Sequence, residues 1–545
     1  MSIPFADMDD DDGVGFVAES HYLKSPTVAE QQAMRLLQVP GRDGRDGSLS
    51  SSVSDLDVPI YSSENLTTTP RREVQSGFNG RLAFAIAASA LGSSFQHGYN
   101  TGVLNNPQKI IEAWINNTMV GRGQVPSQES ITLVFSLMVA IFCVGGMIGG
   151  AITGFVAERF GRKNGLLLNN ILVLLAVIAM SSAKAAASYE LIILGRFLIG
   201  INSGLNAGLA PMYLAEISPV NLRGAVGTVY QLVITISILI AQIVSLKSVL
   251  GTAEHWPTLL ALTIIPAIFQ LATLPFCPES PKYLLLSRGL ELRSQKALSW
   301  LRGTLDVHEE MDGMRAEADA MKLVPKVTIR ELISNSALRI PLVISLTVMI
   351  AQQLSGINAV MFFSSQIFQM AGLNDENATY ATLGMGGINV LMTIVSLFLV
   401  EKAGRKTLLL IGFGGMAIDT ALLTISMLFA DKSRAAGIIC VILVLVYVIM
   451  FASGPGSIPW FLVSELFNQA ARPTASALAV CLNWTANFLV GLAFLPLAVA
   501  LGPYVFIIFV ALQLLFLLFI YKKVPETKNK SLEEIAAMFR QQSYQ

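Results

Sequence analysis

Uncharged amide side chains lie inside several long apolar stretches of this sequence. The segment IAQQLSGINAVMFFSS contains Gln352, Gln353 and Asn358. An amide without a hydrogen-bonding partner in an apolar medium costs roughly 2–7 kcal/mol. Polar groups in membrane spans therefore usually face the interior of a helix bundle or a water-filled cavity. Other polar residues in apolar stretches are Gln231, Asn389, Asn483, Asn487, Trp460 and Trp484.

These residue types suit a neutral ligand that carries several hydroxyl groups. Amides both donate and accept hydrogen bonds, as hydroxyls require, and aromatic faces suit the apolar C–H face of a sugar ring. An ion path would need carboxylates and an anion site would need Arg or Lys, and neither occupies these positions. The alternative is that the amides only hydrogen-bond one helix to another.

The elements that must position these side chains are twelve predicted membrane-spanning helices. A spanning helix needs about 20 predominantly apolar residues. Only 14% of the residues are charged, against about 25% in soluble proteins, which also indicates a membrane protein. The predicted spans are roughly 81–102, 131–157, 164–184, 189–212, 223–248, 257–277, 338–370, 379–400, 406–430, 435–462, 473–499 and 502–522.

The spans predict an all-α membrane protein with two six-helix bundles. The first 77 residues are rich in Ser, Asp and Gly, which predicts disorder. The polar stretch between the sixth and seventh spans contains patterns typical of short amphipathic helices. The expected parts are a tail at 1–77, a bundle at 78–277, a linker at 278–337, a bundle at 338–522 and a tail at 523–545.

Positive charges indicate the orientation, because Lys and Arg concentrate in cytosolic loops. ERFGRK, EKAGRK and the pair Lys522-Lys523 fall on one side. We therefore expect a plasma-membrane protein with both termini and the linker in the cytosol. The loop at about 103–130 would then lie outside, where the sequon at Asn116 is placed for N-glycosylation.

Charged motifs recur in the two halves. GFVAERFGRK follows the second span and FLVEKAGRK follows the eighth, and Arg lies seven residues after Glu in both Glu216–Arg223 and Glu465–Arg472. This order is typical of duplicated bundles with a site at their interface. Pairing of these charges across the halves would bias an inward–outward equilibrium. The alternative is that they only orient the chain in the membrane.

Proline interrupts the tenth span. SGPGSIPW places Pro455 and Pro459 inside it. Proline removes a backbone donor and bends a helix, and broken helices near the midplane are common in transporters. The pattern predicts a bend, which could be a pivot or a purely structural kink.

Together these motifs resemble the sugar porter family of the major facilitator superfamily, and animal facilitative glucose transporters in particular. The resemblance covers about 80–540. It implies the major facilitator fold and uniport of a hexose. The motifs are GRK, GRFLIG, PMYLAEISP, PESPKYLL, QQLSGINAV, GPGSIPWF, NWTANFLVG and PETKNKSLEE.

The resemblance also implies residue roles. The family's sugar contacts and their apolar neighbours correspond to Gln231, Ile234, Ile238, Gln352, Gln353, Asn358, Asn389, Trp460 and Asn487. The family's cytosolic gating charges correspond to Glu158, Arg162, Arg196, Glu216, Arg223, Glu401, Arg405, Glu465 and Arg472.

The sequence departs from the family pattern at several positions. Ala452 stands where glucose carriers commonly have Glu, and Ser457 replaces a proline. Phe362-Phe363 replaces a Tyr pair, and Met349–Ala351 replaces Gln-Leu-Ser. The last difference leaves fructose open beside glucose.

Other functions remain as alternatives. Proton-coupled relatives have Asp where this chain has Asn100, which favours uniport, although His97 and Asp419 are titratable groups within spans. A sugar sensor that hardly transports is a further alternative. The motifs indicate no enzyme, no cofactor and no metal site, and the zero net charge indicates no nucleic-acid partner. The oligomeric state stays open.

Overall fold

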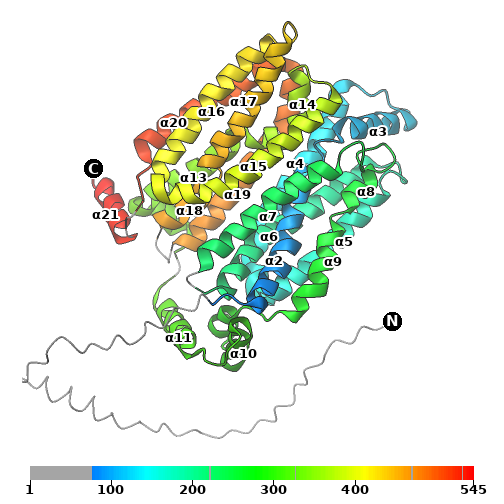
Figure 1. Ribbon diagram of the computed structural model, residues 1–545. Coiled ribbons are helices and arrows are strands. Elements are labelled where there is room, and N and C mark those ends of the chain that lie inside the picture. The colour runs from blue at the N-terminus through cyan, green and yellow to red at the C-terminus, as the bar shows by residue number, and fades with distance from the viewer. Residues whose placement is uncertain (1–76, 220–221, 326, 468–470, 529, 531) are drawn as a thin grey trace, which may run out of the picture. The chain divides into compact units, whose positions relative to one another are not determined.

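The described part of the chain is helical (Figure 1). The computed structural model describes residues 77–545 except 220–221, 326, 468–470, 529 and 531. No β-strand is present within these residues. The predicted tail, 1–77, lies outside the described residues apart from Gly77.

The helices divide into a first half, a linker and a second half. The first half contains α2 (Gly80–Gly102), α3 (Gln108–Gly121), α4 (Gln128–Phe160), α5 (Arg162–Ser182), α6 (Tyr189–Ile217), α7 (Arg223–Val244), α8 (Trp256–Ala261), α9 (Ile264–Thr273) and η2 (Leu274–Phe276). The linker contains the π-helix η3 (Tyr283–Ser287), α10 (Glu291–Arg302), α11 (His308–Leu323) and α12 (Ile329–Ser334). The second half contains α13 (Ser336–Leu354), α14 (Ile357–Met370), α15 (Asp375–Ala403), α16 (Arg405–Leu428), α17 (Arg434–Ser453), α18 (Ile458–Leu466), α19 (Arg472–Leu501), η4 (Gly502–Tyr504) and α20 (Val505–Lys523).

The predicted spans are all helical. Nine segments of the described chain are long and apolar enough to cross a membrane, and one of them, Arg472–Lys523, contains both α19 and α20. The other two spans are α2, which carries Gln96, His97 and Asn100, and α7, whose apolar part is Val229–Val244. The prediction of an all-α, multi-pass membrane protein is confirmed.

The two halves pack against each other mainly through two pairs of helices. α4 of the first half contacts α19 of the second, and α7 contacts α15. In Figure 1, the helices of each half lie together on one side of this seam. We call the end of the bundles beside the linker the linker face, because the Tyr283 hydroxyl bonds there to the Glu158 carbonyl at 3.0 Å. The opposite end, which carries α3, is the far face.

Helix α3 replaces part of the loop expected at about 103–130. Ile111, Ile115 and Met119 recur every four residues and are buried on one side of this helix. This spacing places them on a single helical face, which packs on the bundle. The sequon residue Asn116 therefore lies on a helix.

Glycine allows α4 and α6 to cross closely. A Cβ at Gly145 would lie 2.4 Å from the Phe197 carbonyl oxygen, and one at Gly200 would lie 2.2 Å from that of Phe142. Small residues at membrane helix crossings permit this approach of backbones. The first half is thus held by backbone-to-backbone contact as well as by side chains.

A buried amide network also holds the first half, and the sequence analysis missed it. Gln96 Nε2 donates to Asn170 Oδ1 at 3.1 Å, and Asn170 Nδ2 donates to Gln270 Oε1 at 2.9 Å. Asn206 Nδ2 donates to both Gln96 Oε1 and Asn202 Oδ1, at 3.2 and 3.1 Å. These amides connect α2, α5, α6 and α9, so their role is to hydrogen-bond one helix to another.

Two spans of the second half are broken. Gly356, with φ at +98°, separates α13 from α14, a conformation that glycine adopts without a Cβ penalty. α17 ends at Ser453 and α18 begins at Ile458, so the predicted proline bend is a complete break. After α20, a further helix, α21 (Leu532–Ser543), buries Ile535 and Phe539 against the bundle.

Candidate functional site

The amides of the seventh span form a hydrogen-bonded cluster with α19. Gln353 Nε2 donates to Asn483 Oδ1 at 3.1 Å, and Asn483 Nδ2 donates to Gln352 Oε1 at 2.9 Å. Asn358 Nδ2, on α14, donates to Gln353 Oε1. All four side chains are buried. The structure therefore brings three predicted contacts together and adds Asn483 as their link to α19.

Gln352 also binds the break in the tenth span. Its Nε2 donates to the carbonyl oxygens of Pro455 at 3.0 Å and Gly456 at 2.8 Å. Pro459 has no backbone N–H, so it cannot donate to the Pro455 carbonyl as residue i+4 of a helix normally would. Gln352 supplies the missing donor and joins α13 to the α17–α18 break.

Asn487 offers an acceptor that no neighbour uses. It lies one turn after Asn483 on α19 and is buried. Its Oδ1 has no hydrogen-bonding partner among the described residues. A buried acceptor without a partner is costly unless a ligand or water completes it. This oxygen can receive a ligand hydroxyl.

The other predicted contacts lie on three more helices. Ile234 and Ile238 are buried on α7, whereas Gln231, one turn earlier, is exposed. Asn389 is buried on α15, the helix that packs on α7. Trp460, on α18, is 43% exposed.

Aromatic rings connect the halves beside the amide cluster. The His97 ring on α2 lies 5.8 Å from the Trp484 ring on α19, and His97 Nδ1 is 3.3 Å from the Tyr230 hydroxyl on α7. Trp484 also contacts Phe142, with ring centroids 6.1 Å apart. A Cβ at Gly146 would lie 2.6 Å from the indole, so glycine makes room for Trp484 against α4.

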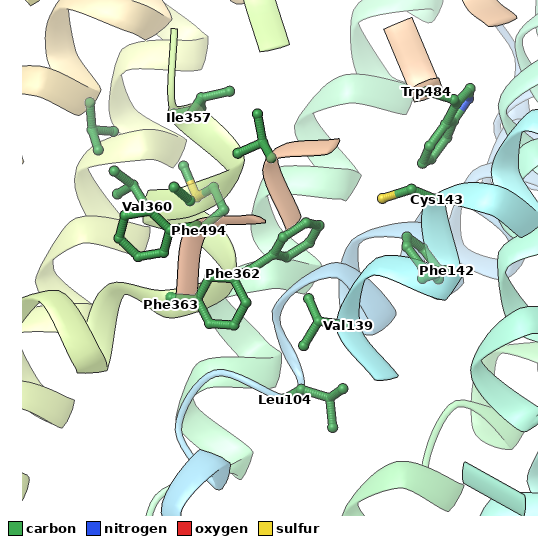
Figure 2. Close-up of a cluster of buried hydrophobic side chains, with 14 of the residues drawn as sticks. Leu104, Val139, Phe142, Cys143, Ile357, Val360, Phe362, Phe363, Trp484 and Phe494 are labelled. Carbon is green, nitrogen blue, oxygen red and sulfur yellow. The ribbon is translucent and has the colours of Figure 1, made fainter. Parts of the chain in front are cut away.

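Phenylalanines seal the path from the cluster toward the far face. The Phe363 ring lies 5.7 Å from that of Phe494 on α19, 6.2 Å from that of Phe362, and 6.4 Å from that of Phe135 on α4. Figure 2 shows Phe362, Phe363 and Phe494 within this buried cluster. Phe363 has non-helical torsion angles, so α14 bends at the seal.

Hydrogen bonds across the halves cover this seal at the far face. Asn105, which follows α2, donates to Ser364 and to the Met361 carbonyl, and its Oδ1 accepts from the Ser365 backbone at 3.1 Å. Asn106 Oδ1 accepts from the Ser365 hydroxyl at 2.9 Å. The far face is therefore closed in this conformation.

At the linker face, the first of the two repeated loops is built around Arg162. Its Nη2 and Nε donate to Glu216 Oε1 at 3.0 and 3.2 Å, and Nη1 lies 3.8 Å from Glu158 Oε1. Glu279 accepts from the backbone N–H groups of Arg162 and Lys163 at the start of α5. A carboxylate at a helix N-terminus is stabilised by the helix dipole.

The second loop repeats these contacts. Arg405 Nη2 and Nε donate to Glu465 Oε1 at 2.9 and 3.1 Å. Glu526 accepts from the Arg405 backbone N–H at 2.9 Å at the start of α16. Thr527 donates to Glu465, and Ser280 makes the equivalent contact in the first loop. The short sequence repeat is thus matched by a repeat of geometry.

The match to known sequences identifies the family. The sequence profile of the family described as "Sugar (and other) transporter" matches residues 85–539. The chain belongs to this sugar transporter family.

Several relatives of this sugar transporter cover most of its length. Solute carrier family 2, facilitated glucose transporter member 3 from Mus musculus is 49% identical over 464 residues, which are 85% of this chain and 94% of that protein. The Homo sapiens protein of that name is 48% identical, over 85% and 93% of the two chains. Member 1 from Gallus gallus is 47% identical over 86% and 95%.

Solved structures with the same fold are also similar to this sugar transporter. The inward open conformation of the xylose transporter XylE from E. coli matches with a TM-score of 0.70 at 27% identity, over 84% of this chain and 99% of that one. XylE is also described as an MFS (major facilitator superfamily) proton:xylose symporter, bound to 6-bromo-6-deoxy-D-glucose, with a TM-score of 0.67, 27% identity and the same coverage. The predicted major facilitator fold is confirmed.

One residue of this sugar transporter lies far from its expected place. Arg196 was placed among the charges of the linker face, but it lies two turns from the far-face end of α6 and is buried. It donates to the carbonyls of Asn100 at 2.7 Å and Met138 at 3.1 Å, and its guanidinium lies over the Phe142 ring. The prediction was wrong because it followed the family motif and not the place of Arg196 near the start of the predicted span 189–212, which begins on the side opposite the linker.

Some of the expected linker-face charges form ion pairs in this conformation. Arg162–Glu216 and Arg405–Glu465 each join helices of one half. Arg472 Nη2 donates to the Phe467 carbonyl at 3.2 Å. The side chains of Arg223 and Glu401 lie outside the described residues.

Sequence reasoning missed several residues of the two faces. Glu279 and Glu526 lie in PESPK and PETK, which were noted only as parts of a resemblance. In both motifs a Glu directly follows the proline that ends a span. This acidic residue could have suggested a cap for the N-terminus of a neighbouring helix. Asn105 and Asn106 gave no comparable signal, because their partners on α14 are more than 250 positions away. No cluster of three or more potential metal ligands occurs in the described residues.

Proposed function

We propose that this sugar transporter is a facilitative hexose uniporter that moves glucose, fructose or both by alternating access. The observation that supports this most directly is the buried cluster of Gln352, Gln353, Asn358 and Asn483 at the helix breaks. Relatives that are 47–49% identical are described as facilitated glucose transporters. Amides that donate and accept match the hydroxyl groups of a hexose.

The sugar would bind between the halves, beside the α13–α14 and α17–α18 breaks. Asn487 Oδ1 supplies a free acceptor there. The proposal of fructose as a substrate rests on the replacement of Gln-Leu-Ser by Met349–Ala351. The proposed contacts are Gln231, Ile234, Ile238, Gln352, Gln353, Asn358, Asn389, Trp460 and Asn487.

Alternating access would require each face to close in turn. The far face is closed here by the rings around Phe363 and by Asn105 and Asn106. The charges proposed to influence opening of the linker face are Glu158, Arg162, Glu216, Arg223, Glu401, Arg405, Glu465 and Arg472. The pairs Arg162–Glu216 and Arg405–Glu465 would act by bracing the ends of the helices within each half.

The proposed location is the plasma membrane, with the linker face and both termini in the cytosol. The excess of Lys and Arg in the linker-face loops supports this orientation. Asn116 on α3 would then be glycosylated outside the cell. A shift in electrophoretic mobility on treatment with an endoglycosidase, absent in Asn116→Gln, is the expected result.

Proton-coupled symport is the second candidate. XylE, described as a proton:xylose symporter, supports it, and so does Asp419 on α16, whose two buried carboxyl oxygens have no partner among the described residues. Against it, Asn100 stands where proton-coupled relatives have Asp, and its amide donates to the Gln96 carbonyl and the Thr263 hydroxyl, at 2.8 and 2.9 Å. An amide carries no exchangeable charge at physiological pH, so we favour uniport.

Uptake into proteoliposomes tests the proposal. Purified protein in liposomes should accumulate radiolabelled glucose or fructose to equilibrium, and unlabelled hexoses should compete. A panel of glucose, fructose, galactose and a polyol ranks the substrates. Saturable binding without flux would instead support a sugar sensor, for which the replacement of Glu by Ala452 is the main argument. If hexoses show no binding and no flux, hexose is excluded as the ligand.

A further inference from the structure

One carboxylate at the far face joins the two halves by charge. Asp375, the first residue of α15, lies 2.7 Å from Lys109 Nζ and 3.7 Å from Lys247 Nζ. Lys109 is on α3 and Lys247 is in the turn after α7, so both lysines belong to the first half and Asp375 to the second. Neither sequence motifs nor the proposed sugar contacts include these three residues.

The surroundings of Asp375 hold its charge in place. Gln369 Nε2 donates to Asp375 Oδ1 at 3.0 Å. Asn374 caps α15 by accepting from the Asn377 backbone N–H, and the N-terminus of a helix favours a negative charge in its first turn. The carboxylate is thus oriented from its own half before it meets the lysines.

The contact lines a cavity between the two halves. This cavity has a volume of about 250 Å³ and is lined by residues of both halves, including Lys109, Lys247, Gln369 and Asp375. The Lys109 and Asp375 side chains are 55% and 41% exposed, so the pair is hydrated and sensitive to salt. Glu112, on α3 beside Lys109, is hydrogen-bonded by Gln108, and burial raises the pKa of its carboxyl above its usual range.

A comparison with ion pairs at the linker face indicates the role of the Asp375 contacts. There, Arg162–Glu216 and Arg405–Glu465 each join helices of one half, so they can persist when the halves separate. The Asp375 contacts join different halves and cannot persist when the far face opens. They are formed only in states whose far face is closed, so they favour those states.

We propose that Asp375, Lys109 and Lys247 form a charge latch that favours closure of the far face and thereby sets how often the sugar site is open to that side. This inference rests on the proposed transport function. Exposed ion pairs contribute modestly, so the expected change in the ratio of open to closed far faces on loss of the latch is about two- to five-fold. The apparent affinity for sugar offered from the far face would improve by the same factor, because it depends on the fraction of molecules in the competent state.

Cysteine accessibility measures the latch without relying on transport. Ser365 lies under Asn106 and is 5% exposed in the closed face. Ser365→Cys, expressed in intact cells, is treated with a membrane-impermeant maleimide. We expect Asp375→Asn to raise its labelling rate about two- to five-fold. Val125 is 96% exposed in the far-face loop, so labelling of Val125→Cys shows that the reagent reaches this face.

Two further variants separate a latch from general loosening. The double variant Lys109→Gln with Lys247→Gln should raise labelling as Asp375→Asn does, and should add nothing in the Asp375→Asn background. Glu190→Gln is the matched control, because Glu190 pairs with Arg122 at 2.6 Å on the same face but within the first half. About 1 M salt should speed labelling with Asp375 present and leave it unchanged in Asp375→Asn.

The outcomes distinguish this inference from the proposed function. Unchanged labelling in Asp375→Asn, with normal sugar uptake, would overturn the latch and leave the uniporter intact. Faster labelling in a protein without sugar flux would support the latch and overturn the proposed transport. Equal acceleration by Glu190→Gln would also overturn the latch, because it would mean that any lost ion pair loosens the face.

Discussion

At the scale of single residues, Gln352 and Asn487 differ in how their hydrogen-bonding groups are used. Gln352 donates to two backbone carbonyls at the α17–α18 break and accepts from Asn483. Asn487 Oδ1 is buried without a partner among the described residues. Gln352 therefore supports the structure as well as the proposed site, whereas Asn487 is free to serve a ligand.

Alanine substitutions should separate these two roles. Asn487→Ala should raise the apparent KM for hexose about five-fold, corresponding to roughly 1 kcal/mol, with an unchanged Tm. Gln352→Ala should raise KM and also lower Tm, since two buried carbonyls lose their donor at a cost of about 1–3 kcal/mol. Uptake kinetics measure KM, and thermal unfolding in detergent measures Tm.

The control is Asn117→Ala, which removes an exposed amide on α3. A wild-type KM for Asn487→Ala would contradict the assignment of Asn487 as a sugar contact.

At the scale of elements, the two halves are held differently. In the first half, α4 and α6 touch through their backbones at glycines, and buried amides link four helices. In the second half, two spans are broken and Gln352 connects the breaks. The first half has one broken span, between α8 and α9, and the second half has two, so we expect the second half to deform more during opening.

Glycine substitutions test the tight crossing. Gly200→Ala should lower Tm and the yield of folded protein, because its Cβ would lie 2.2 Å from the Phe142 carbonyl oxygen and overpacking costs about 1–3 kcal/mol. Gly154→Ala, on the same pair of helices, is the matched control, since nothing lies within 4 Å of its Cβ. Equal Tm values for the two variants would show that α4 can move away from α6 without penalty.

At the scale of the whole molecule, the direction and coupling of transport depend on which charges must move. The acidic residue of proton-coupled relatives is replaced by Asn100, whose amide is bonded to Gln96 and Thr263. At the linker face, Arg162 pairs with Glu216 and Arg405 pairs with Glu465, each within one half. Hexose movement should therefore carry no proton.

A pH-sensitive dye in proteoliposomes tests this coupling. A hexose gradient should drive sugar flux without changing the pH on either side, since the proposed sugar site contains neutral amides. Asp419→Asn should leave the flux unchanged and serves as the control for the buried carboxyl on α16. Hexose-driven alkalinisation that disappears in Asp419→Asn would instead establish symport.

The amino-acid sequence was sufficient to predict that the apolar stretches are helices and to find three members of the amide cluster. In lipid, backbone polar groups must be satisfied within the segment, so an apolar run of about 20 residues forms a helix whatever its neighbours are. An amide in such a run is equally informative. Leaving it without a hydrogen-bonding partner in lipid costs free energy, so it must face a polar partner. Gln352, Gln353 and Asn358 could be read in this way.

The partners of those residues were decided only by the tertiary structure. Spacing along one helix gives the face of a side chain but not the helix opposite, so Asn483 and the Pro455 carbonyl could not be assigned to Gln352. The Asp375 contacts join residues more than 100 positions apart, and only the packing of the two halves brings them within a few ångströms.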